Sequence, residues 1–164
     1  MRRKRINSFT RIAMMTAVLE TVEFALNAFP NVELVTLSII VFTRRFGWKE
    51  TVPACLLFAI IECFWWGFGT WSMVYFVIWP FLVLLTTLLP LEGALPHALL
   101  SGFFGLGFGA FCALFTLAMA GLNAAIAWWI TGIPYDLVHG IANFIVALFL
   151  FKPLMKAMEY IPNQ

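Results

Sequence analysis

Polar side chains recur at helical spacing inside an otherwise apolar part of the sequence. The first group holds Thr16, Glu20, Glu23 and Asn27, which follow one another at intervals of four, three and four residues. This spacing places the side chains on one face of a helix. Carboxylates and amides on one face could line a substrate cavity, or they could simply pair with neighbouring helices. The spacing allows both interpretations.

A second group lies near the other end of the chain. Asp136, His139 and Asn143 are three and four residues apart, with Gly140 beside them and Tyr135 just ahead. They form either a ligand-binding stripe or a helix cap with a network of hydrogen bonds between helices. An Asp–His pair also fits catalysis, but no serine lies in a G-x-S-x-G elbow. We therefore predict no hydrolase and no catalytic residue.

Glu62 precedes a loop rich in tryptophan and glycine. Trp65, Trp66 and Trp71 flank two glycines, which permit close approach and movement. These rings could form a stacking lid over a flat ligand, or they could belong to the aromatic belt at a membrane interface. The belt is our prediction for Trp79.

The composition identifies the surroundings of these groups. Of the 164 residues, 63% are hydrophobic and 11% are charged, whereas soluble domains are about 45–50% apolar. This excludes a soluble enzyme, a disordered chain and a nucleic-acid-binding protein. We predict an all-α integral membrane protein that forms one domain over residues 1–164. It begins with a basic segment, 1–9, and has six transmembrane helices at about 10–29, 32–46, 52–66, 72–89, 95–120 and 135–151.

The cations predict the orientation in the membrane. All ten Lys and Arg residues lie in the N-terminal segment, in the turn at 44–49 or in the C-terminal tail. Six spans place these three segments on the same side, and an excess of cations marks the cytoplasmic side. We expect a multi-pass protein of the cell membrane with both termini cytoplasmic. The loops around 27–33, 65–72 and 121–134 would then be extracellular.

Small residues predict where helices approach one another. Ala13-x-x-x-Ala17 and Gly105-x-x-x-Gly109 are patterns that permit close contact between membrane helices. No phosphate-binding G-x-x-x-x-G-K-[ST] loop is present, so any ATP would be used by a partner. The cysteines lie in apolar runs without a C-x-x-C pair, and we expect buried thiols and no metal site for Cys55, Cys63 and Cys112.

Two longer motifs carry a family resemblance. Residues 30–36 read Pro-Asn-Val-Glu-Leu-Val-Thr. Residues 132–144 read Gly-Ile-Pro-Tyr-Asp-Leu-Val-His-Gly-Ile-Ala-Asn-Phe, and Lys152-Pro153-Leu154 follows. With its six predicted spans and basic start, the chain resembles the substrate-binding S components of energy-coupling factor (ECF) vitamin transporters over essentially its whole length.

The resemblance implies a function and partners. S components are six-helix membrane proteins that capture a vitamin or related micronutrient on the extracellular side. They dock on a membrane-embedded T component that carries two cytoplasmic ATPases, and they are thought to topple in the membrane to carry the ligand inward. The resemblance assigns Ala13 and Ala17 to contact with the T component. It implies no cofactor for this chain, since ATP is used by the partner subunits.

The resemblance also implies a ligand pocket in the outer half, among the later helices and outer loops. With the polar face of the first span, the predicted substrate-binding residues are Glu23, Asn27, Glu62, Trp65, Trp66, Trp71, Trp128, Trp129, Tyr135, Asp136, His139 and Asn143. The outer half is acidic and lacks Lys and Arg, which disfavours folate-like polyanions. Cobalamin and thiamine-like, pyridoxine-like or queuosine-related compounds stay open. The alternative function is a small intramembrane enzyme or a free-standing channel.

Overall fold

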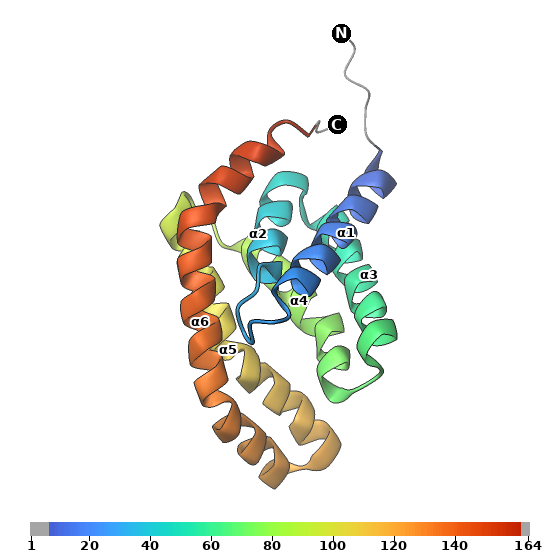
Figure 1. Ribbon diagram of the computed structural model, residues 1–164, viewed down its shortest axis with the longest axis vertical. Coiled ribbons are helices and arrows are strands. Elements are labelled where there is room, and N and C mark those ends of the chain that lie inside the picture. The colour runs from blue at the N-terminus through green and yellow to red at the C-terminus, as the bar shows by residue number, and fades with distance from the viewer. Residues whose placement is uncertain (1–6, 162–164) are drawn as a thin grey trace.

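The computed structural model describes residues 7–161, apart from the side chain of Thr70. This part of the chain is all-α, as predicted, and residues 1–6 of the predicted basic segment lie outside it. Its six helices are α1 (Ser8–Leu26), α2 (Val35–Phe46), α3 (Trp48–Trp66), α4 (Thr70–Leu88), α5 (Ala94–Ala120) and α6 (Leu122–Met158). Figure 1 shows α5 and α6 along one side of the bundle and α1 and α3 along the other.

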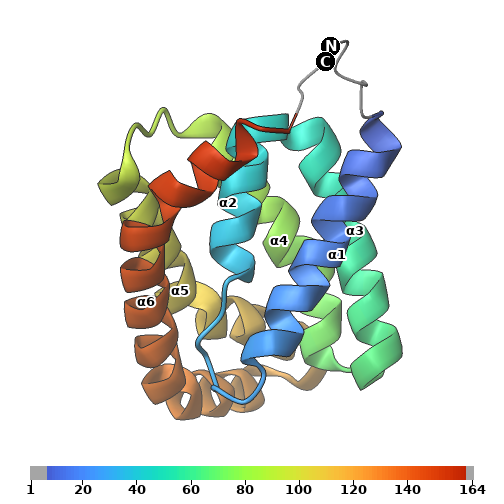
Figure 2. The ribbon, with the colours of Figure 1, turned by 45° about the horizontal axis from the view of Figure 1, so that its top comes forward.

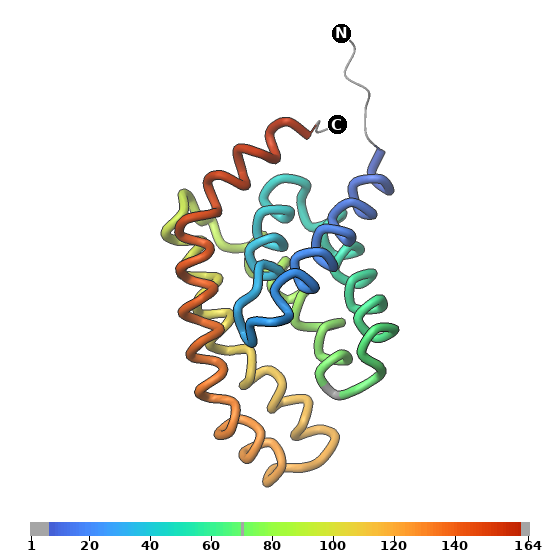
Figure 3. Tube along the Cα trace, in the orientation of Figure 1, coloured from blue at the N-terminus to red at the C-terminus, as the bar shows by residue number. Residues whose placement is uncertain are grey.

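The shortest helix, α2, is the centre of the bundle. Residues 35–43 are all buried, and α2 contacts each of the other five helices. Its 12 residues extend only about 18 Å, against roughly 30 Å for the hydrocarbon core of a bilayer. The loop 27–34 therefore reaches into the bundle to meet the start of α2 (Figure 3). It leaves a cavity beside Val35, the first residue of that helix.

Three helices are long and apolar enough to cross a membrane: α4, α5 and α6. In the apolar segments of α5 and α6, only 28% of the residues are buried within the chain. Their exposed side chains include Phe103, Leu114, Met119 and Phe149. Water-soluble proteins rarely expose continuous apolar surface on this scale, whereas lipid accommodates it. These features indicate a membrane protein, in agreement with the composition.

The segment 121–134 differs from its prediction. We expected a connection there and a last helix starting near Tyr135, but α6 begins at Leu122. Gly121 alone separates it from α5, and its φ of +84° is a conformation that glycine adopts without strain. Trp128 and Trp129 are consequently helical residues rather than loop residues.

Pro134, the last residue of the predicted connection, lies inside α6. In lipid the backbone has no water to bond, so a continuous helix is favoured even across a proline. The hydroxyl of Thr131 donates a hydrogen bond of 2.8 Å to the carbonyl oxygen of Ala127, in the turn before the proline. In Figure 1 the C-terminal part of α6, which holds Pro153, turns away from the axis of its central part.

Glycines allow α5 and α6 to approach closely, as the Gly105-x-x-x-Gly109 pattern predicts. A Cβ atom added to Gly105 would lie 3.0 Å from the Cα atom of Gly140, and one added to Gly109 would lie 2.8 Å from Cγ of Asp136. The backbone N–H of Gly109 donates a 3.0 Å hydrogen bond to Oδ1 of Asp136. This contact exists because no side chain at position 109 separates the two helices.

A pair of alanine substitutions on α5 tests this packing. Gly109→Ala should lower the free energy of unfolding in detergent by about 2 kcal/mol, because the methyl group displaces Asp136 and its hydrogen bond. Gly107→Ala is the matched control, since an added Cβ there meets nothing within 4 Å. It should raise the free energy of unfolding by roughly 0.5–1 kcal/mol, the ordinary gain of alanine over glycine in a helix. If both variants changed the free energy of unfolding in the same direction, close packing at Gly109 would not explain the result.

The basic turn between α2 and α3 lies beside the two ends of the described chain (Figure 2). Arg45 Nε donates a 2.9 Å hydrogen bond to the carbonyl oxygen of Met158 at the end of α6. Arg11 Nε, near the start of α1, donates a 2.7 Å hydrogen bond to Oε2 of Glu50 at the start of α3. The cation-bearing segments within residues 7–161 therefore meet at one end of the bundle, which we call the basic end.

Candidate functional site

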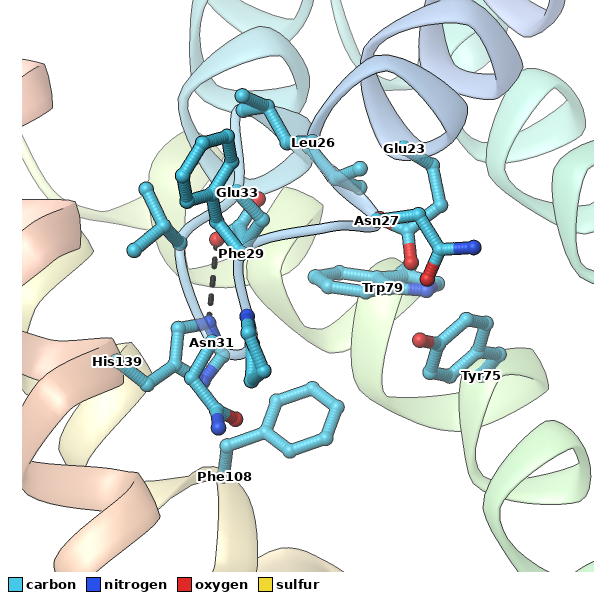
Figure 4. A pocket seen from close by; sticks show the side chains of 13 residues that line it. Glu23, Leu26, Asn27, Phe29, Asn31, Glu33, Tyr75, Trp79, Phe108 and His139 are labelled. Carbon is cyan, nitrogen blue, oxygen red and sulfur yellow. Dashed lines mark hydrogen bonds and ion pairs between the residues drawn. The ribbon is translucent and has the colours of Figure 1, made fainter.

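A cavity of about 160 Å³ lies between the loop 27–34 and helices α4, α5 and α6 (Figure 4). Its walls are formed by Glu23, Leu26, Asn27, Phe29, Pro30, Asn31, Val32, Glu33, Val35, Tyr75, Trp79, Phe108 and His139. Most of these residues come from the end of α1 and the loop that follows it. The cavity therefore opens on the part of the bundle away from the basic end.

Glu33 fixes the loop to two helices. Its Oε2 accepts a 2.7 Å hydrogen bond from the backbone N–H of Thr36, and its Oε1 lies 3.2 Å from Nε2 of His139. Burial by itself raises the pKa of the Glu33 carboxyl, but the bonds from His139 and Thr36 outweigh it and hold the pKa below its usual range. Glu33 is thus a carboxylate at neutral pH, held between α2 and α6.

Aromatic rings line the side of the cavity opposite the loop. Tyr75 and Trp79 are one helical turn apart on α4, and their ring centroids are 5.2 Å apart. Phe108 of α5 lies 5.8 Å from Trp79 and 5.3 Å from His139 of α6. The rings form one continuous wall across three helices.

Trp79 was assigned to the membrane belt, and that prediction is wrong. The side chain is only 2% exposed and lines the cavity. It packs among the rings of α3, α4 and α5, including Phe58 at 6.4 Å. Its indole Nε1 is buried and has no hydrogen-bond partner among the described residues. Buried indole nitrogens usually have a partner, so this donor is an unusual feature of the cavity wall.

Three of the predicted binding residues lie in the cavity wall: Glu23, Asn27 and His139. Two other predicted residues of α6, Asp136 and Asn143, lie behind this wall. Asn143 Nδ2 donates a 3.3 Å hydrogen bond to the hydroxyl of Thr36, next to the bond that Thr36 makes with Glu33. Oδ1 of Asp136 accepts the hydrogen bond from the backbone N–H of Gly109. Of the three polar residues predicted on α6, His139 therefore lines the cavity, and Asp136 and Asn143 hold neighbouring helices in place.

The predicted tryptophan lid does not cover the cavity. Trp65 and Trp66 are exposed and pack against Phe24 of α1, with ring centroids 5.7 Å and 6.4 Å away. Trp71 is one ring removed from the cavity, at 5.5 Å from Tyr75. These contacts stabilise the ends of α1, α3 and α4.

Four more predicted residues lie outside the cavity lining. Glu62 is 1% exposed on α3, and its Oε1 has no hydrogen-bond partner within the described part of the chain. Trp128, Trp129 and Tyr135 are exposed on α6. Because 121–134 is helical, Trp128 and Trp129 lie on the exposed surface of α6 and not on a loop that could close over the bundle.

The cavity also contains residues that were not predicted, chiefly Glu33, Tyr75 and Phe108. Glu33 was visible as an acid within the 30–36 motif, and the spacing of Tyr75 and Trp79 was visible as one helical turn. In a sequence with 17% aromatic residues, however, such a spacing does not distinguish a cavity wall from ordinary packing.

Protein-family models, curated protein sequences and solved structures give no match to this chain. Within residues 7–161, no three His, Cys, Asp or Glu side chains are grouped so that they could hold a metal ion. The cysteines in this range are free and buried. The geometry offers a binding cavity with a charged edge and an aromatic wall.

Proposed function

We propose that the chain is the substrate-binding S component of an ECF-type ABC importer for a water-soluble vitamin or related micronutrient. One observation carries the proposal. The two motifs that resemble this family are separated by about a hundred positions, yet they meet at the cavity through Glu33 and His139. Two distant motifs that together line one cavity are expected of a site that binds a ligand.

The orientation follows from the charges. An excess of Lys and Arg marks the cytoplasmic side of a membrane protein, so the basic end faces the cytoplasm in this proposal. Both termini are then cytoplasmic, all six helices lie within the cell membrane, and the cavity faces the outside. The short α2 is shielded from lipid by the other five helices.

Transport would need partners, because this sequence has no phosphate-binding loop of the G-x-x-x-x-G-K-[ST] type. The proposed partners are a T component and two ATPases, which use the ATP. Ala13 and Ala17 of α1 are exposed in the bundle and leave a shallow strip for a partner helix.

Co-expression of the full chain with a T component and two ATPases from the same cells tests the proposal. The four proteins should co-purify, and Ala17→Trp should abolish the complex and uptake while ligand affinity stays unchanged, because the cavity lies elsewhere. Ala118→Trp changes an alanine of α5 that is also exposed; it is the matched control and should retain the complex. A chain that never co-purifies with these partners refutes the proposed function.

A further inference from the structure

We infer that the ligand of this cavity is a small organic cation whose charge is carried on or beside a single flat ring. This rests on the proposed function and specifies the chemistry of its ligand. Charge, aromatic wall and volume point to the same class independently of one another.

Acidic side chains line the cavity. Glu23 and Glu33 line it, together with no Lys or Arg, and the sequence has none between Glu50 and Phe151. Glu33 is already matched by His139 and Thr36. Glu23 makes no hydrogen bond or ion pair with any residue from 7 to 161, and Figure 4 shows its carboxylate pointing into the cavity. A carboxylate in an enclosed space favours an opposite charge beside it.

The aromatic wall specifies more than charge. Tyr75, Trp79 and Phe108 line the cavity together with the two carboxylates. The faces of such rings attract cations and stack with flat heterocycles. The matching ligand is therefore flat and cationic.

The volume limits the size of the ligand. The cavity measures about 160 Å³. An apolar protein cavity of about 150 Å³ holds one benzene molecule. The cavity therefore holds one ring and its substituents, and a macrocycle such as a corrin does not fit inside it.

Three probes with the same ring test the charge. Binding to the purified full chain is measured for 1-methylnicotinamide, a permanent cation, for neutral nicotinamide and for anionic nicotinate. The cation should bind at least about tenfold more tightly than nicotinamide, which needs only part of the attraction between unit charges about 4 Å apart in a protein. Nicotinate should bind most weakly. Equal affinities, a preference for nicotinate or no binding of the cation overturns the inference.

Glu23→Gln should bring the affinity ratio of cation to neutral probe close to one, because it removes the charge and keeps the size of the side chain. Glu92→Gln is the matched control, since Glu92 is exposed between α4 and α5 and does not line the cavity. It should leave the ratio unchanged. If Glu23→Gln keeps the natural preference for the cationic over the neutral probe, Glu23 is not the group that recognises the cation. A chain that co-purifies with the T component but lacks charge preference refutes this inference alone, whereas loss of that complex refutes the proposed function.

Discussion

Replacing Arg11 with methionine should lower the free energy of unfolding by about 3–5 kcal/mol. Arg11 and Glu50 are 4% and 8% exposed and join α1 to α3 through the Nε–Oε2 hydrogen bond of 2.7 Å. Removing the guanidinium leaves the Glu50 carboxylate buried without its cation. Methionine keeps much of the apolar stem, so the effect reports the charge rather than the packing. Titration with dodecyl sulfate in mixed micelles measures the change.

The double variant Arg11→Met/Glu50→Met separates the effect of the unpaired carboxylate from the effect of lost packing. With both charges removed, the free energy of unfolding should return most of the way to that of the natural chain, because no buried charge is left without a partner. A double variant as unstable as Arg11→Met would show that packing, and not the unpaired carboxylate, dominates. Lys49→Met serves as a control, since Lys49 is an exposed cation in the same region and its loss should change stability little.

The second large effect is expected at the cavity. Glu33→Ala should weaken ligand binding about 10- to 100-fold, the equivalent of one or two charge-assisted hydrogen bonds. It detaches the loop 27–34 from Thr36 and His139 and also removes a negative charge from the cavity. The amount of ligand that co-purifies with the chain, measured by mass spectrometry, is the readout.

Glu33→Gln should fall between the alanine variant and the natural chain, because an amide oxygen can still accept the bond from Thr36. Glu92→Ala, which removes an exposed acid from another loop, should retain the natural amount of ligand. Equal retention by Glu33→Ala and Glu92→Ala would mean that the ligand does not bind under the loop 27–34.

The helical architecture could be predicted from the sequence because its strongest signals are local. Apolar runs punctuated by Pro30, Gly47 and Gly121 separate the helices well. The exception is Pro134. Proline usually ends a helix in water, but it is tolerated in a long helix that lipid surrounds. That one residue led to the wrong start of α6 and to the expectation of an outer tryptophan loop.

The cavity could be predicted only in part. His139, Glu23 and Asn27 were found because polar residues in an apolar span stand out. Tyr75, Trp79 and Phe108 were not found, because aromatic rings are ordinary residues in membrane helices and only their meeting across α4 and α5 makes a wall. Which helices become neighbours is a property of tertiary packing, and spacing along one helix does not contain it.

The connection of α5 to α6 has a consequence for biogenesis. A single residue joins the two helices, and glycines bring their backbones into contact, so this hairpin can form from sequence neighbours as soon as both helices enter the bilayer. The cavity cannot form this way, because its walls run from Glu23 of α1 to His139 of α6. A ligand that binds there stabilises only chains in which α6 has already been inserted. Under the proposed function, the supply of ligand would thereby also select for correctly assembled molecules in the membrane.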